Sequence, residues 1–541
     1  MKKLLAMLLC IVMILSLLAG CGGGKEAEEP DDGKIRLKIG LLQNATVMDY
    51  EENAFTKWLE EQTGYELEFQ MFASNAGDAK SQLAAMVSTG EELPDILWRM
   101  GLGDSVTREY GEQGYFLDLR EFYEDRELSA TFWERFENEL SEQEQKDNLQ
   151  RMTDVDTGAI YTVPRIEGST IDVMDYQVWI NQAWLDELSL EAPTDPDSLY
   201  DVLVAFKNRD SSCIPLIGAE DRLGADVVNW IVNMFIYCND VRRFNVDENG
   251  QLSVPYVQDA YREALIYINK LVKEGLLSTM SWSIANDNDL KAISTPANGN
   301  AMAGIFVGHL TLHTSFGNKV LYDYVPLDCF GYALVNENLN SRGTYITYDC
   351  EHPEEAFKLL MTMFSEEGSI RMRYGEYGTN WEEADKGAKS ALGNDAKIKV
   401  LQDPWTMTNN ACWGAIDSTL LINAEGEATQ FDEASMDEWT LFKSKIVAQM
   451  VDIYYARAQE KNPKVTCPAL VYTLEEEERT EQIRSNCGQY INKSRSEFCT
   501  GTMNPNDDAQ WQAYLDQLEQ LGLQDWLDLA QTVYDRQLSE N

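Results

Sequence analysis

Near the start of the chain, hydrophobic residues alternate with polar ones over two short stretches, and a third short stretch leads from Pro94 into an apolar run, which predicts three β-strands. These stretches are residues 35–39, 67–71 and 94–98. Between them, apolar residues recur at the spacing of amphipathic helices, and each helical pattern stops at a glycine, Gly64 or Gly90. Glycine adopts the left-handed backbone conformation that ends many helices, so we expect both helices to end there.

The order strand, helix, strand, helix, strand predicts a parallel sheet with right-handed crossovers and helices on both faces. In such sheets, ligands bind beyond the carboxyl ends of the strands. Those ends lie at Gln43–Asn44, Phe72–Asn75 and Trp98–Arg99. We therefore expect these residues to line one wall of a ligand-binding cleft.

Three patterns further along the chain have structural interpretations. Asn249–Gly250 separates two short alternating stretches and predicts a hairpin turn, which is favoured over a calcium loop for the acidic residues beside it. Thr473 with Glu476 fits a capping box at the start of a helix. The apolar residues of Trp511–Leu518 lie at helical spacing and predict a core stripe rather than a platform for sugars.

The start of the chain has a pattern of its own. Lys2 and Lys3 precede an apolar run, Leu4–Leu15, which is shorter than the roughly 20 residues of a membrane-spanning helix. Small residues then lead to Cys21, and Gly22–Gly33 contains no hydrophobic side chain larger than alanine. This is the pattern of a signal peptide followed by a flexible tether.

Leu18–Cys21 resembles the lipobox of bacterial lipoproteins. The resemblance implies cleavage before Cys21 and acylation of its sulfur and of the new amino group, which supplies the lipid chains that stable anchoring needs. The mature protein would then be tied to a membrane surface outside the cytoplasm. The alternative is an ordinary secretory signal with a chance cysteine.

The composition indicates a large soluble body with an acidic surface. The chain has 541 residues, 44% of them hydrophobic, which suggests about two to four domains. Its formal net charge of -47 opposes binding to nucleic acid and to anionic lipid heads. We therefore expect contact with a membrane only through the lipid anchor.

Neither cysteine nor histidine spacing predicts a metal site. His309 and His313 are four residues apart, but their neighbours are apolar and no acidic ligand is close, so we interpret them as packed histidines. The cysteines after Cys21 are scattered without a Cys-x-x-Cys pair, and both disulfides and buried thiols fit them. They are Cys213, Cys238, Cys329, Cys350, Cys412, Cys467, Cys487 and Cys499. We expect no metal and no cofactor.

A series of short motifs extends along nearly the whole mature chain. The first reads KSQLAAMVSTGEELPDIL at Lys80–Leu97, and the others lie at Gly114–Leu119, Asp156–Pro164, Trp179–Leu188, Val202–Arg209, Leu265–Leu277, Gly299–Gly308, His352–Ala356, Tyr374–Trp381 and Trp511–Trp526. In order and spacing they resemble family 1 extracellular solute-binding proteins, the receptors of bacterial ABC importers. The longer members of that family, lipoproteins associated with oligosaccharide uptake, fit best.

The resemblance implies an α/β fold of two lobes, the type II periplasmic-binding-protein-like fold. Each lobe would be a mostly parallel sheet flanked by helices, and hinge crossover strands would join the lobes. Residues 1–20 would be the signal peptide, and 21–34 the lipidated cysteine and tether. Lobe 1 would comprise residues 35–165 and about 328–400, and lobe 2 residues 166–327 and about 401–541.

The resemblance also implies a function without catalysis. The lobes would close around a carbohydrate, most simply an oligosaccharide, and the closed form would dock on the permease subunits of an ABC transporter. Some longer members have a calcium loop after the helix equivalent to Val202–Arg209, but Asp210–Pro215 is too short and too poor in carboxylates to form one. We therefore expect no calcium there.

Ligand-binding candidates are aromatic and hydrogen-bonding residues at predicted element ends or in polar loops. Sugar rings need flat apolar faces, and their hydroxyls need amides, carboxylates or guanidinium groups. The candidates are Trp98, Arg99, Arg165, Asp226, Trp230, Trp282, Phe306, Asn380, Trp381 and Trp413. Because the two arginines could form a local basic site, both neutral and acidic sugars stay open.

Two other classes of protein fit parts of the sequence. A surface glycan hydrolase or lyase would need paired carboxylates, which 91 acidic residues supply by chance, but no hydrolase or phosphate-binding motif is present. A lipoprotein that binds glycan or peptide for sensing or adhesion would use the same two-lobed scaffold. The sequence does not separate that class from an importer receptor.

Overall fold

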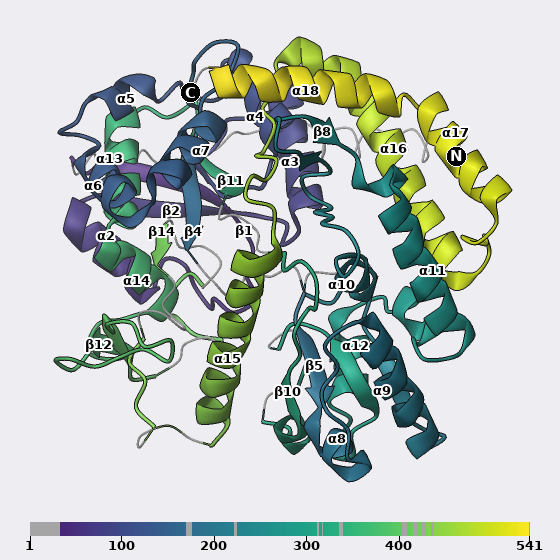
Figure 1. Ribbon diagram of the computed structural model, residues 1–541. Coiled ribbons are helices and arrows are strands. Elements are labelled where there is room, and N and C mark those ends of the chain that lie inside the picture. Colours follow the sequence, from purple (N-terminus) through teal and green to yellow (C-terminus); the bar gives the residue numbers. More distant parts are fainter. Residues whose placement is uncertain are drawn as a thin grey trace, which may run out of the picture.

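The computed structural model describes residues 33–168, 176–220, 224–310, 313–315, 317–334, 339–402, 408–414, 420–422, 429–433, 436 and 438–539. Figure 1 shows two lobes, with long C-terminal helices that lie against the second lobe and reach the first. The predicted signal peptide, Cys21 and nearly all of the predicted tether lie outside the described residues.

The first lobe is built on a six-stranded sheet. In spatial order its strands are β14 (Leu420–Ile422), β4 (Val163–Gly168), β11 (Leu339–Ile346), β3 (Ile96–Trp98), β1 (Arg36–Leu42) and β2 (Glu66–Phe72). β1 pairs in parallel with both β2 and β3, which confirms the predicted parallel arrangement. The intervening helices, α2 (Ala54–Thr63) and α3 (Ala76–Thr89), end at Gly64 and Gly90 in the left-handed conformation, as predicted.

Helices cover the faces of this sheet and bury its apolar side chains. They are α4 (Asp104–Glu112), α5 (Arg120–Glu124), α6 (Ala130–Glu139), α7 (Glu142–Met152), α13 (Pro353–Phe364) and α14 (Glu366–Tyr374). Phe132 of α6 and Phe364 of α13 are both fully buried, with ring centroids 5.2 Å apart. This contact packs a helix that precedes the passage of the chain to the second lobe against a helix that follows its return to the first lobe.

The second lobe contains a four-stranded sheet in the order β10 (Tyr324–Pro326), β5 (Val178–Asn181), β9 (Ala303–Val307), β6 (Ile214–Ile217). Only β6 and β9 are parallel, and β5 is antiparallel to both of its neighbours. The expectation of a mostly parallel sheet is therefore wrong for this lobe. The reason is that β5 receives the chain from the first lobe, so it starts where β9 ends, with Val178 opposite Val307.

Several shorter elements complete the second lobe. Its helices are α8 (Gln182–Leu188), α9 (Pro196–Arg209), α10 (Val227–Val232), α11 (Asp259–Lys273) and α12 (Asp287–Ser294), with 3₁₀ turns η1 (Pro255–Val257), η2 (Thr279–Trp282) and η3 (Lys319–Asp323). The hairpin predicted around Asn249–Gly250 is confirmed by the antiparallel pair β7 (Asn245–Val246) and β8 (Leu252–Ser253). A second small pair, β12 (Trp381–Glu383) and β13 (Ile398–Val400), follows α14.

Four C-terminal helices pack on the second lobe: α15 (Glu438–Lys461), α16 (Leu474–Thr500), α17 (Asp508–Gln520) and α18 (Leu523–Ser539). Trp511, Tyr514 and Leu518 belong to the same buried cluster as the second sheet, which confirms the predicted core stripe. The capping box of Thr473 and Glu476 also forms, at the start of α16.

Residues just after position 401 lie with the first lobe, although we expected them in the second. Trp413 is buried in the core of the first lobe, and β14 is the outermost strand of its sheet. The loop at 409–414 is held there because Met48 and Ala54 donate backbone hydrogen bonds to the carbonyls of Asn409 and Asn410. Packing with the second lobe resumes at α15.

The chain crosses between the lobes from β4 to β5 and returns from β10 to β11. The two crossings touch, since the Tyr176 hydroxyl donates to the carbonyl of Tyr332 over 2.6 Å. Helix α15 holds the returning segment. Its Arg457 pairs with Asp328, and the Asn462 side chain exchanges two hydrogen bonds with the backbone of Ala333.

The eight cysteines after Cys21 all lie in the described residues, and none of them forms a disulfide with another. Seven are buried and Cys213 is half-buried. Within the same described ranges, no helix combines the length and apolar character required to cross a membrane.

A buried arginine joins the first lobe to the C-terminal segment. The Arg108 Nε of α4 donates to Asp154 over 2.7 Å, Nη2 donates to the Tyr472 carbonyl over 2.9 Å, and Nη1 lies 3.4 Å from Glu477 of α16. Although burial pushes the pKa of Asp154 upward, its hydrogen bonds from Thr157 and Arg108 hold it below the usual range. Arg108 therefore satisfies groups from three segments at once.

We expect Arg108→Met to lower the free energy of unfolding by about 3 kcal/mol, because it leaves buried carboxylates without their cation. Urea unfolding measures the loss. Arg120→Met is the matched control: Arg120 pairs with Asp118 on the surface, where such pairs contribute at most about 1 kcal/mol. Equal losses in the two variants would contradict the role assigned to Arg108.

Candidate functional site

The topology brings the carboxyl ends of strands from both sheets to the side where the chain crosses. In the first sheet, β1, β2, β3 and β14 run in the same direction as β4, whose end leads into the crossing. In the second sheet, β6 and β9 run opposite to β5, which starts at the crossing. We name these two sets of strand ends the interlobe edges. Ligands of open α/β sheets bind at such edges.

At the first interlobe edge, Trp98 and Trp413 form part of a buried aromatic cluster. The Trp413 ring contacts Tyr50, Phe55 and Trp98 edge to face, with centroids 5.2–6.0 Å apart. Its indole N–H donates to Thr56 over 2.9 Å, so its polar atom is satisfied inside the lobe. The Trp98 N–H has no acceptor among the described residues. These rings therefore belong to the buried core of the first lobe next to the first interlobe edge.

The two predicted arginines are also buried at this lobe. Arg99 follows β3 with a φ of 50°, and its guanidinium lies over the Trp98 ring, 4.9 Å from the centroid. Arg165 lies within β4, opposite Asn340 of β11. Both side chains are covered, so neither is an exposed cation.

The ligand-binding candidates of the second lobe are not gathered in one place. Phe306 lies in the core between the rings of Trp179 and Tyr324, and Trp230 is fully buried in α10, 6.2 Å from the ring of Phe330. Trp282 ends η2 and is half-buried against the same core. Asp226 is the N-cap of α10 and accepts from the backbone N–H groups of Val228 and Asn229.

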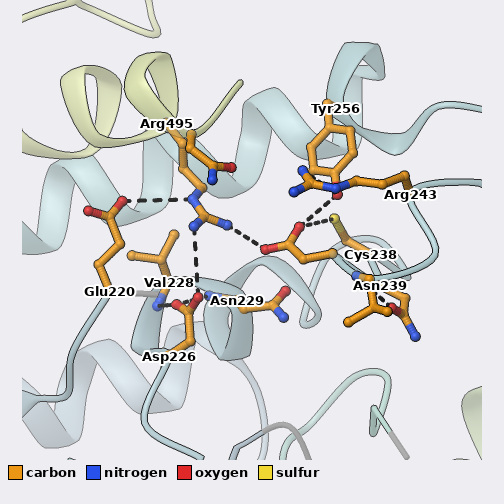
Figure 2. A network of polar contacts seen from close by, with 12 residues as sticks. Glu220, Asp226, Val228, Asn229, Cys238, Asn239, Arg243, Tyr256 and Arg495 are labelled. Carbon is orange, nitrogen blue, oxygen red and sulfur yellow. Dashed lines mark hydrogen bonds and ion pairs between the residues drawn. The ribbon is translucent and has the colours of Figure 1, made fainter. Parts of the chain in front are cut away.

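Asp226 belongs to a polar network around Arg495 of α16, which Figure 2 shows at close range. Arg495 Nη1 donates to Asp240 over 2.7 Å, while Nη2 lies 3.8 Å from Asp226 and Nε 3.8 Å from Glu220. The Tyr256 hydroxyl also donates to Asp240, over 2.7 Å. Glu220 stands just beyond the end of β6, so the network reaches the second interlobe edge. We name Glu220, Asp226, Asp240 and Arg495 the Arg495 network.

The carboxylates of this network differ in proton affinity. Burial raises the pKa of Asp226 to about 6, and the neighbouring charges of Asp240 and Glu220 add to the rise against the pull of Arg495. Burial also pushes the pKa of Asp240 upward, but Arg495, Arg243 and the Tyr256 hydroxyl together hold it below its usual range. Near neutral pH, Asp240 is thus the firmest anionic partner of Arg495.

The remaining candidates, Asn380 and Trp381, stabilise a turn between α14 and β12. Asn380 accepts from the backbone N–H of Glu376 over 3.0 Å, and the Trp381 indole donates to the Gly375 carbonyl over 3.0 Å. Trp381 packs with Tyr374 and Ile398 in a separate small cluster. The ten candidates therefore do not converge on one cavity, and their part in ligand binding stays a prediction.

The sequence did not single out Arg495, Asp240 or Glu220. Arg495 stands between two serines in a helix whose exposed face is strongly charged, and Asp240 lies in a loop beside Asn239. Nothing in either stretch marks a buried ion pair. Only the capping position of Asp226 carried a local signal, an acidic residue directly before a helical pattern.

A pocket of about 110 Å³ lies beside β4 and β11, between the first lobe and the segment before α16. Its lining includes Arg108, Asp154, Tyr161, Tyr345 and Tyr472. The volume is below that of typical ligand pockets, which run from about 300 to 1,000 Å³. We assign it to the contact around Arg108 described above.

Across the described ranges, no group of three or more His, Cys, Asp or Glu side chains could hold a metal ion. His313 Nδ1 accepts from the His309 backbone N–H over 2.8 Å, and Nε2 lies 3.3 Å from Asp287. Both histidines are buried in the loop after β9, so they are packed rather than exposed.

Known proteins resemble this chain over half or nearly all of its length. It is homologous to FusA, the fructooligosaccharide ABC transporter substrate-binding protein of Streptococcus pneumoniae, with 22% identity over 568 residues that cover 96% of each protein. Lipoprotein LipO of Bacillus subtilis is 24% identical over 285 residues, 51% of each protein. No protein-family model matches the chain.

Solved structures share the fold. FusA in complex with kestose superposes with a TM-score of 0.72 at 21% identity, over 94% of this chain and all of that one. An HMO-binding solute-binding protein from Bifidobacterium longum infantis gives 0.74 at 19% identity, over 93% of this chain and 99% of that one. The fold expected from the motifs, that of solute-binding proteins, is therefore confirmed.

The Arg495 network makes stability depend on pH. Because the folded pKa of Asp226, about 6, is above its unfolded value, folding favours the protonated acid. The stabilisation is complete below about pH 4 and is lost as the pH rises through about 6. Asp226→Asn keeps a good helix cap but cannot lose a proton, so its stability should not fall in this way. Between about pH 4 and pH 7, the unfolding free energy of the variant should therefore rise relative to that of the wild type by up to roughly 3 kcal/mol.

Urea unfolding at several pH values measures that difference. Asp195→Asn is the matched control, because Asp195 is the N-cap of α9 and its hydrogen bonds from Ser198 lower its pKa. Its difference should therefore stay nearly constant between about pH 5 and 7 and change in the opposite direction only below about pH 4. A pH-independent difference for Asp226→Asn would contradict the assignment.

Proposed function

We propose that this chain is a membrane-anchored solute-binding protein, facing outside the cytoplasm, that captures an oligosaccharide between its lobes and delivers it to an ABC transporter. The observation that carries this proposal is the homology to FusA across 96% of both proteins, together with the shared two-lobed fold. FusA is described as a fructooligosaccharide-binding protein, so fructooligosaccharides are the first ligands to test.

The interlobe edges supply the ligand site in this proposal. A ligand that contacts both edges is bound best when the lobes approach each other, so it shifts the population toward a closed state by its extra contacts there. The crossings near Tyr176 and Tyr332 would act as the hinge, because these two segments lie side by side and lead directly from one sheet to the other. No bond is made or broken, and the related proteins are substrate-binding proteins rather than enzymes.

Cys21 is the proposed anchor. After cleavage it would carry the lipid chains, and residues 22–34 would tether the first lobe to the membrane surface. LipO, a relative over half of its length, is described as a lipoprotein. Anchoring keeps the receptor near its transporter and raises its effective concentration there.

We expect one neutral oligosaccharide to raise the thermal unfolding midpoint, because a ligand that binds only the folded state adds about 2.7 kcal/mol at 100 times its dissociation constant. The panel starts with kestose and includes longer fructooligosaccharides and other neutral and acidic oligosaccharides. Small-angle X-ray scattering should show a smaller radius of gyration with the bound sugar, as closure requires.

Monosaccharides at the same mass concentration are the control for non-specific sugar effects. No midpoint shift with any oligosaccharide would contradict carbohydrate capture and favour a peptide-binding or adhesive lipoprotein. Release of shortened sugars during the assay would contradict the binding-only function.

We expect Cys21→Ser to move the protein from the membrane fraction to the medium, because acylation needs the cysteine sulfur. Cys10→Ser, a change within the apolar signal run, is the matched control and should leave the protein in the membrane fraction. Metabolic labelling with a fatty acid provides the readout of lipidation. Membrane retention of Cys21→Ser would contradict the anchor.

A further inference from the structure

We infer that the Arg495 network makes the second interlobe edge a subsite for neutral, hydroxyl-rich sugars and against sugars that carry carboxylates. Glu220 and Asp240 would accept hydrogen bonds from ligand hydroxyls, and Arg495 would position them without contacting the ligand. The inference rests on the proposed function and specifies the chemical class of its ligand.

The network surrounds one cation with three anions. Arg495 Nη1, Nη2 and Nε face Asp240, Asp226 and Glu220 at 2.7, 3.8 and 3.8 Å, and Figure 2 shows Glu220 and Asp226 on different sides of the guanidinium. Arg243 contributes a second positive charge, but it lies against the ring of Tyr256. The guanidinium of Arg495 is thus directed entirely at protein carboxylates.

Burial separates the two signs of charge. The Arg495 side chain is 3% exposed, whereas Glu220, Asp226 and Asp240 are 19%, 10% and 21% exposed. A molecule that approaches this edge therefore meets carboxylate oxygens and not the guanidinium. An anionic ligand would be repelled, because like charges in a partly desolvated site interact strongly.

The two less buried carboxylates, Glu220 and Asp240, have hydrogen-bonding capacity left. Each carboxylate can accept about four hydrogen bonds. Glu220 accepts one from the Ser496 hydroxyl over 2.5 Å, and Asp240 accepts from Arg495 and Tyr256 and from the Cys238 thiol at 3.8 Å. Sugar hydroxyls are donors, and hydrogen bonds to ionised acceptors are stronger than neutral ones.

One donor of the network and two hydroxyls beside it make no hydrogen bond within the part of the chain that the structure describes. The Arg495 Nε and the hydroxyls of Tyr261 and Ser494 are buried and have no hydrogen-bond partner in the described residues. Arg495 Nε faces the Glu220 carboxylate at 3.8 Å, so a small movement of Glu220 on ligand binding would satisfy this donor without contact between Arg495 and the ligand.

The first interlobe edge offers no compensating cation among its predicted residues. The side chains of Arg99 and Arg165 are as well covered as that of Arg495. An acidic sugar would therefore meet exposed carboxylates on one side and buried guanidinium groups on the other. The sequence left both neutral and acidic sugars open as ligands, and this arrangement favours neutral sugars.

The test compares affinities of the wild-type protein for neutral and acidic sugars by calorimetry. The neutral probes are kestose, maltotriose and xylotriose, and the acidic probe is trigalacturonate. Glu220→Gln and Asp240→Asn keep the shape of each side chain but remove its charge. Glu187→Gln is the matched control, because Glu187 pairs with Arg209 on α9, away from the network.

We expect a neutral probe to bind the wild type and trigalacturonate to bind at least tenfold more weakly. Glu220→Gln should weaken binding of the neutral sugar about tenfold, as loss of a charge-assisted hydrogen bond predicts. It should also reduce the ratio of the affinity for the neutral sugar to the affinity for trigalacturonate. Arg495→Lys tests positioning: it should also narrow this preference, whereas a merely structural role would lower the melting temperature and leave the ratio of affinities unchanged.

The outcomes separate the inference from the proposed function. Binding of no sugar, neutral or acidic, would contradict carbohydrate capture itself. Tighter binding of trigalacturonate than of any neutral probe would leave carbohydrate capture standing and overturn the inference. Unchanged affinities and ratios in Glu220→Gln and Asp240→Asn, as in Glu187→Gln, would also overturn it.

Discussion

The structure depends on how the chain passes between its lobes. Two antiparallel strand pairs, β4 with β11 and β5 with β10, lie on either side of the crossings. A chain that leaves one sheet at a carboxyl end and enters the next through β5 necessarily places the carboxyl ends of β6 and β9 at the crossing. The proposed site and the proposed hinge are therefore consequences of the same connectivity.

Helix α16 links the two regions in which charges are buried. Its Glu477 contacts Arg108 of the first lobe near one end, and its Arg495 binds Asp240 of the second lobe near the other. At 1.5 Å per residue these positions are about 27 Å apart along the helix. In both places one arginine satisfies several carboxylates, which suits a chain with 91 acidic and 44 basic residues. Any rotation of one lobe against the other acts on α16 at both contacts.

Local patterns predicted the local features of the fold. The strands and helices of residues 35–98, the glycine ends of α2 and α3, the hairpin at Asn249–Gly250 and the capping box at Thr473 depend on neighbours in sequence. The direction of β5 and the position of Trp413 depend on where the chain passes between the lobes and where it returns. A short stretch of sequence does not contain that information. Loop composition was a poor guide to exposure, because the polar atoms of Asn380 and Trp381 bond back to their own turn.

The Arg495 network shows why a buried ion-pair network, and the binding surface we propose for it, is harder to predict than a strand. Arg495 and Asp240 are 255 residues apart, and neither has a neighbour that predicts a buried ion pair. The sequence offered two arginines, Arg99 and Arg165, among the ligand-binding candidates, which left acidic sugars open as ligands. What a ligand meets, however, depends on which charges remain exposed after folding. Here the guanidinium groups are covered and Glu220 and Asp240 are only partly covered, so in our proposal burial rather than the presence of arginine determines the charge that a ligand meets.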